Sequence, residues 1–128
     1  MVLGWIGAGL TLPYYGAEVF GLHAIAAQAV QDGSPALLEL TDVVRYQPAA
    51  VTMFGLGLVL LAAAVALVAV VLGRSRLRPR WVGVPLAVGF VLFIPQFFAS
   101  PALRILHGAL VAVGAIMVAV VLWRAPST

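Results

Sequence analysis

The chain has 128 residues, of which 64% are hydrophobic and only 9% are charged. A soluble domain is roughly 45–50% apolar and about 25% charged, so this composition predicts a single domain that is embedded in a lipid bilayer. The absence of cysteine excludes disulfides and thiol chemistry, and a formal net charge of +3 is too small and too dispersed to indicate a nucleic-acid partner.

The first apolar segment covers residues 2–28 and contains Pro13 and Glu18. No basic residue precedes it, whereas a cleaved signal peptide normally begins with positive charge, so we expect a retained membrane helix. From Trp5 to Tyr15 is only about 15 Å of helix, which is too short to cross a hydrocarbon core of roughly 30 Å. The helix is therefore predicted to continue past Pro13, with a kink, and to carry Glu18 inside the membrane.

The next segment reads SPALLELTDVVRYQP and covers residues 34–48. Ser34 can cap a helix and Pro35 can open one, and the apolar residues that follow form a short apolar face. We expect a short helix lying on the outer membrane interface. It either carries the chain from the first span to the second, or it acts as a lid over a site.

Three further spans are predicted at residues 49–73, 81–98 and 101–123. The first of these has no charged residue over about 37 Å of helix. Pro48 and the pair Ser100-Pro101 are typical of helix starts. The span 81–98 contains Pro85 and Pro95, which predict a kink in it.

Arginine residues predict the orientation of the chain. The loop RSRLRPR between the second and third spans contains four arginines, and Arg124 follows the last span. Because positive residues of short loops stay in the cytoplasm, we expect this loop and both termini inside, with Trp5, Trp81 and Trp123 at the cytoplasmic interface. The predicted fold is an all-α integral membrane four-helix bundle with residues 1–128 as one transmembrane domain.

Five polar residues from three of the spans fall at a similar predicted depth. Counted at 1.5 Å per residue from the three tryptophans, they lie roughly 20–28 Å from the cytoplasmic ends. They are Glu18, His23, Gln96, Arg104 and His107. Because a charge that faces lipid is costly, these side chains should face the bundle. The most economical pairing joins Glu18 to Arg104 or His107.

Two interpretations of this polar cluster stay open. It is either a clasp that fixes the helix register, at about 1 kcal/mol per bond, or a site for a small ligand, a proton or a lipid headgroup in a permease-like subunit or membrane enzyme. Two histidines could ligate haem, and with Glu18 they could bind zinc, but no attachment motif or local ligand spacing is present. No catalytic residue, metal or cofactor is assigned, and a structural or interaction subunit is favoured over an enzyme.

Small residues recur at helical spacing. The pairs are Gly4 with Ala8, Gly55 with Val59, Gly108 with Ala112, and Ala115 with Ala119. Such faces let helices approach closely. Packing within the bundle explains them, and so does contact with a second copy or another membrane protein.

The segments YYGAEVFGLHAI and FIPQFFASPALRILHG resemble a group of small, uncharacterised actinobacterial four-helix membrane proteins, over most of the chain from Leu12 onward. The segments GAEVFGLHAI and VVRYQPAAV are also similar in order to a bacterial inner-membrane family with a GAFGAHAL motif followed by YQxxHAL. Here the first motif has an extra Glu-Val, and Ala50 stands where the second has histidine. Both resemblances imply a multi-pass protein of the bacterial plasma membrane, and neither implies an activity. The exclusive use of arginine as the basic residue is also typical of a GC-rich bacterial genome.

Overall fold

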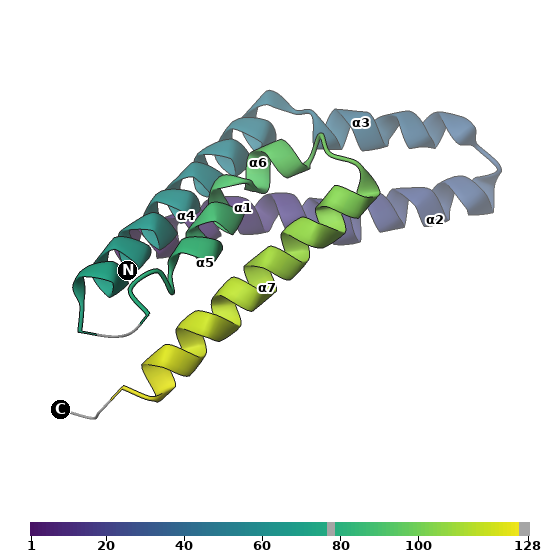
Figure 1. Ribbon diagram of the computed structural model, residues 1–128. Helices are drawn as coiled ribbons and strands as arrows, with labels where there is room; N and C mark the ends of the chain where they lie inside the picture. Colours follow the sequence, from purple (N-terminus) through teal and green to yellow (C-terminus); the bar gives the residue numbers. More distant parts are fainter. Residues whose placement is uncertain (77–78, 126–128) are drawn as a thin grey trace.

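The computed structural model describes residues 1–76 and 79–125, and every regular element in these ranges is helical (Figure 1). In chain order they are α1 (Val2–Gly16), the π-helical turn η1 (Ala17–Gly21), α2 (Leu22–Asp32), the 3-10 turn η2 (Pro35–Leu38), α3 (Glu39–Arg45), α4 (Pro48–Arg74), α5 (Val84–Val91), α6 (Phe93–Gln96) and α7 (Pro101–Trp123).

The first three elements form one continuous helical run over residues 2–32, about 46 Å long at 1.5 Å per residue. The run passes through Pro13, as predicted, and ends four residues beyond the predicted position. Gly33 terminates it in the left-handed conformation with φ 59°, where a residue without a Cβ has no steric penalty. The backbone N–H of Ser34 then donates to the carbonyl of Ala29, which satisfies one of the last free carbonyls of α2.

The long first helix packs against α4 through two glycines. A Cβ placed on Gly7 would lie 2.8 Å from the carbonyl oxygen of Gly57, and one on Gly57 would lie 2.7 Å from Cγ2 of Thr11. The hydroxyl of Thr11 donates back to the carbonyls of Gly7 and Ala8, so this buried polar group is satisfied within its own helix. These contacts set the register between α1 and α4.

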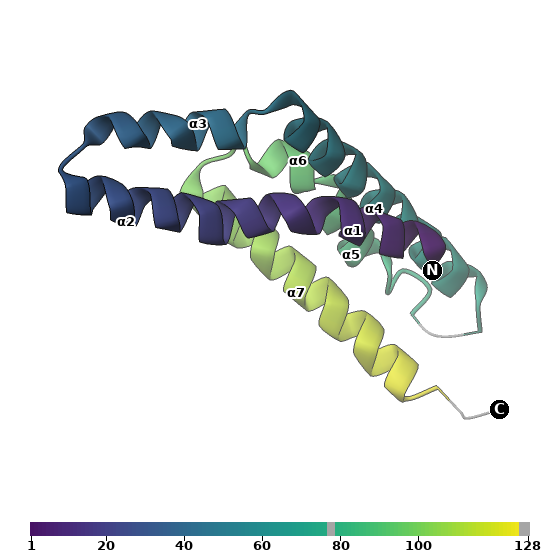
Figure 2. The same cartoon turned by 180° about the vertical axis from the view of Figure 1, so that it is seen from behind.

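Beyond this crossing, α2 extends past the first residue of α4 and pairs with η2 and α3 (Figure 2). The result is a helical hairpin, residues 22–45, that projects from the rest of the molecule. A short helix was predicted between the first two spans, and α3 is that helix.

Two helices in the described residues are long and apolar enough to cross a membrane. They are α4, with a mean hydropathy of 2.9 over its most apolar window, and α7, with 2.6. Proline occupies the first turn of both helices, as predicted from Pro48 and Pro101.

The helical part of the third predicted span is shorter than residues 81–98. It consists of α5 and α6, which are separated at Leu92 and together cover about 20 Å. Pro95 has no N–H to donate to the carbonyl of Val91, and its ring would clash with that carbonyl, so α5 ends at Val91. The expected irregularity is therefore a break in the helix.

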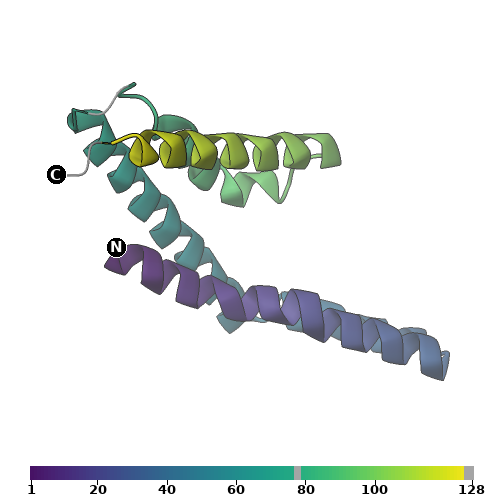
Figure 3. The same cartoon turned by 90° about the horizontal axis from the view of Figure 1, so that it is seen from below.

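The helices pack in the sequence α1, α4, α5, α7, so that each contacts its neighbour in this series. Seen from below, α5, α6 and α7 form one layer, the first helix lies in another, and α4 crosses between them (Figure 3). The start of α1, the end of α4 and the end of α7 lie at the same end of the molecule (Figure 1). The hairpin of α2 and α3 lies at the other end.

Candidate functional site

Glu18 forms an ion pair with Arg45, which is the last residue of α3. The guanidinium donates two hydrogen bonds to the carboxylate, from Nε to Oε1 at 2.8 Å and from an Nη atom to Oε2 at 3.0 Å. The hydroxyl of Tyr14 donates to the backbone carbonyl of Arg45 at 3.2 Å. A planar guanidinium that meets both carboxylate oxygens holds one geometry, so this contact fixes the end of α3 against the first helix.

The predicted pairing of Glu18 with Arg104 or His107 is wrong, because Glu18 faces α3 and not α7. Its side chain is 28% exposed and that of Arg45 is 39% exposed, so the pair lies at the surface of the protein. The prediction placed all helices upright in one closed bundle. The crossing of α1 over α4 instead carries Glu18 to the first residues of α4, where α3 ends.

The hydrogen bond to Glu18 and the charge of its carboxylate raise the pKa of the Arg45 guanidinium above its usual range. A guanidinium does not lose its proton in proteins, so only the carboxylate can break the pair by titrating.

An aromatic cluster adjoins this ion pair and shares Tyr14 with it. The buried ring of Phe54 stacks on Tyr14 with centroids 4.3 Å apart, and it meets Tyr15 and Phe97 edge-on at 5.4 and 5.7 Å. Phe54 thus joins α4 to α1 and to the residue that follows α6. We call the ion pair and these four rings the outer clasp.

His107 lies on the side of α7 that faces α5. Its Nε2 is 2.8 Å from the carbonyl oxygen of Gly89, and the edge-on ring of Phe93 lies 5.0 Å away between centroids. A carbonyl only accepts, so Nε2 carries the hydrogen and donates it. Gly89 permits this approach, because a Cβ there would lie 2.6 Å from Cγ2 of Val111.

His107 and Gln96 line one open groove of about 320 Å³ between α6 and α7. The other lining residues are Leu92, Pro95, Ala99, Leu103, Leu106 and Leu110. Two of the five predicted site residues are therefore brought together, in surroundings that are otherwise apolar. We call this feature the α6–α7 groove.

Arg104 is not one of the lining residues, but it contacts the wall of this groove near the start of α7. Its guanidinium donates to the carbonyls of Ala99, at 3.2 Å, and Phe97, at 2.5 Å, and Ala99 is itself part of the groove wall. These bonds satisfy carbonyls in the connection between α6 and α7. The side chain remains exposed.

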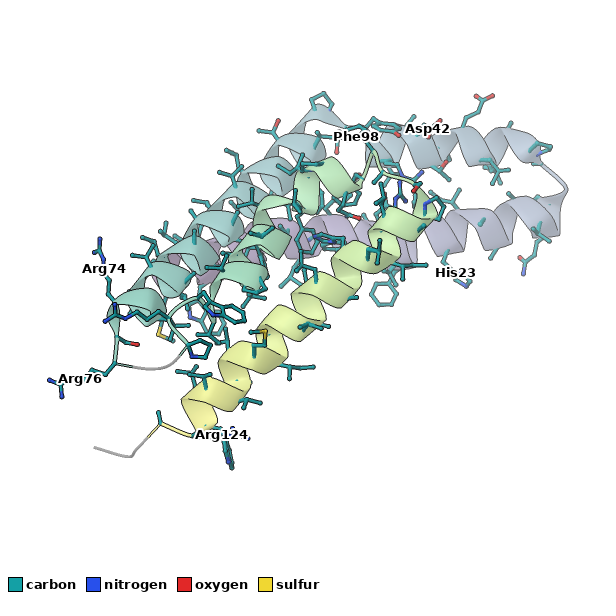
Figure 4. The ribbon with its side chains drawn as sticks, in the orientation of Figure 1. His23, Asp42, Arg74, Arg76, Phe98 and Arg124 are labelled. Atoms are coloured by element: carbon teal, nitrogen blue, oxygen red, sulfur yellow. The ribbon has the colours of Figure 1, made fainter. Side chains whose placement is uncertain are left out.

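His23 does not join the other predicted residues. It is exposed on α2, in the projecting hairpin (Figure 4). The predicted polar layer is thus three separate features, which are the outer clasp, the α6–α7 groove with Arg104, and an isolated histidine. Within residues 1–76 and 79–125, no three histidine or carboxylate side chains gather where they could hold a metal ion.

The fold defines an all-helical protein with two helices that are long and apolar enough to span a membrane. No protein-family model matches the chain, and neither a curated protein nor a solved structure is significantly similar to it. The arguments for function therefore come from the geometry of the helices.

Proposed function

We propose that the chain is a multi-pass protein of the bacterial plasma membrane and acts as a structural or interaction subunit without catalysis. The main observation behind this proposal is the large apolar surface that the protein exposes. The accessible surface is 8838 Å², whereas a compact soluble monomer of this mass exposes about 6,500 Å². Ile105, Ile116 and Trp123 of α7 are 74%, 62% and 91% exposed. Lipid or another apolar helix is the surrounding that suits such side chains.

In this proposal the chain crosses the bilayer four times. The first crossing consists of α1 with η1, about 30 Å over residues 2–21, and the pair of α5 and α6 is the shortest crossing. The distribution of positive charge supports cytoplasmic termini. Arg74, Arg76 and Arg124 lie at the end of the molecule where α1 begins and α7 ends (Figure 4). The hairpin of α2 and α3 then lies on the outer side, at or beyond the membrane interface.

The outer clasp supports a structural role, because it fixes the end of the projecting hairpin to the first helix and fixes that helix to α4. A second feature supports interaction with a partner. Gly108, Ala112, Ala115 and Ala119 recur every three or four residues and are all exposed, so they form a seam along α7 about a quarter of a turn away from the residues that contact α5. A second copy or another membrane protein could pack closely on such a seam.

Cysteine accessibility in intact cells tests the topology, since the natural chain has no cysteine. Gln31→Cys lies at the exposed tip of the hairpin, and Ser75→Cys follows α4 at the other end. A membrane-impermeant thiol reagent should label the first variant in intact cells and the second only after the membrane is opened. Labelling of both in intact cells, or recovery of the protein in the soluble fraction, contradicts the proposal.

The alternative is a small-ligand or lipid-binding site, as in a permease-like subunit or a membrane enzyme. The α6–α7 groove supports it, since Gln96 and His107 add polar groups to an apolar wall. The variants Gln96→Leu and His107→Phe distinguish the two roles. A structural role predicts lower thermal stability with unchanged ligand retention, whereas a binding role predicts loss of a copurifying small molecule.

A further inference from the structure

We propose that the α6–α7 groove binds an anionic glycerophospholipid, with one acyl chain along the groove and the phosphate at Arg104. This inference rests on the proposed membrane location. It adds a specific lipid class and a specific contact to that proposal.

The groove has the chemistry of an acyl-chain site. Leu103, Leu106 and Leu110 lie at spacings of three and four residues and therefore share one face of α7. Leu92 and Pro95 form the opposite wall. The groove is open along its side and is not an enclosed cavity, so a chain can lie in it while the rest of the lipid stays in the bilayer.

Arg104 supplies a positive charge that no carboxylate balances. Within the described ranges the one ion pair is Glu18 with Arg45, which is formed by other helices. A guanidinium has five N–H donors, and Arg104 uses one at Nε and one on an Nη atom for backbone carbonyls. Three donors remain for a phosphate, which is the group that the planar arginine side chain binds best.

The spacing of the polar groups matches the headgroup region of a phospholipid. Arg104 precedes His107 by three residues, so it lies about 4.5 Å further out along α7. Gln96 also lines the groove, and its amide N–H groups suit the ester carbonyls that follow the phosphate. His107 already donates through Nε2 to Gly89 and serves as part of the wall.

The charge of the site selects against other lipids. A zwitterionic headgroup brings a cation, and α5, α6 and α7 contain no Asp or Glu to meet it. An inorganic phosphate would meet Arg104 without the contribution of the leucine wall. We therefore expect selectivity for a lipid with a net negative headgroup.

The test uses the full chain, purified in a neutral detergent. Thermal unfolding is followed with added phosphatidylglycerol, with phosphatidylcholine of the same acyl chains, and with inorganic phosphate. We expect phosphatidylglycerol to raise the melting temperature by several degrees and the other two to have little effect. Native mass spectrometry should show one retained phosphatidylglycerol per chain.

Arg104→Gln should weaken the apparent affinity for phosphatidylglycerol roughly tenfold, as the loss of a charged hydrogen bond does. Leu106→Trp fills the groove without changing any charge and should have a similar effect. Arg74→Gln is the matched control, because it removes the same charge at the opposite end of the molecule (Figure 4).

The proposal is overturned if Arg104→Gln keeps the full lipid response, if Arg74→Gln loses as much, or if phosphatidylcholine stabilises equally. Should Arg104→Gln fail to fold, Leu106→Trp and the lipid comparison on the natural chain still decide the question. These outcomes are independent of the cysteine labelling, which alone tests the membrane topology.

Discussion

The crossing of α1 over α4 can be tested by replacing Gly57 with alanine. The new Cβ would lie 2.7 Å from Cγ2 of Thr11, 2.8 Å from the carbonyl oxygen of Gly7 and 3.0 Å from Cβ of Leu10. Carbon atoms normally meet at about 3.5–4.0 Å, and the Gly7 oxygen belongs to the backbone and cannot turn away. The two helices must therefore separate by several tenths of an ångström.

Overpacking of this kind costs about 1–3 kcal/mol. Alanine also favours the helix over glycine by about 0.5–1 kcal/mol, which partly offsets the loss. Gly55→Ala is the matched control, since nothing lies within 4 Å of a Cβ at that position. Both variants gain the same helix propensity, so their difference of about 1–3 kcal/mol reports the steric contact alone.

The assay is equilibrium unfolding in mixed micelles, with the free energy of unfolding compared between the natural chain and the two variants. We expect Gly57→Ala to be the less stable variant and Gly55→Ala to be as stable as the natural chain or slightly more so. If the two variants agree within about 0.5 kcal/mol, the close glycine contact does not exist as described.

Three further predictions concern the outer clasp and the α7 seam. A double-mutant cycle with Glu18→Gln and Arg45→Gln should give a coupling of about 0.5–1 kcal/mol in unfolding free energy, because both side chains are partly exposed. The absence of coupling would show that the ion pair does not stabilise the clasp. Phe54→Ala should destabilise by about 3 kcal/mol or more in the same assay, while Phe98→Ala, at 89% exposure, should change stability by less than about 0.5 kcal/mol. Gly108→Leu should leave the melting temperature unchanged, since nothing lies within 4 Å, and should reduce cross-linked dimers in membranes; an unchanged dimer yield would exclude the seam as a contact.

The positions of the long helices could be predicted from sequence, because each depends on local chemistry. An uncharged apolar run preceded by Pro48 predicts α4 to within one residue at each end, and Pro101 predicts the start of α7. Pro95 predicts an irregularity in the third segment. None of these predictions requires knowledge of which helices touch.

The partners of the polar residues could not be predicted in the same way. Counting residues along each helix gives comparable depths only if the helices run parallel to one another, and the first helix crosses α4 at an angle (Figure 3). Tyr14 and Glu18 are four residues apart and share a helix face, which is a local signal for a common partner. Arg45 is the one positive residue between the first two predicted spans, and opposite charge was a signal for pairing it with Glu18.

The contacts of the small residues could not be predicted from sequence either. Repeats of Gly and Ala predict close approach, but they do not say which glycine faces a neighbour. Gly7, Gly57, Gly89 and Gly114 lie at helix contacts, whereas Gly55 and Gly108 face open space. The distinction depends on the rotation of each helix about its own axis, which only the assembled structure fixes.

That rotation also links the glycine contacts to the candidate sites. The Gly7–Gly57 crossing sets how far the first helix reaches past Pro48, and so it places Glu18 beside Arg45. The close approach of Gly114 to Leu86 and of Gly89 to Val111 holds α5 against α7, and so it places His107 on the Gly89 carbonyl and forms one side of the α6–α7 groove. The outer clasp and the α6–α7 groove therefore each depend on a small residue at a helix crossing that carries no chemistry of its own.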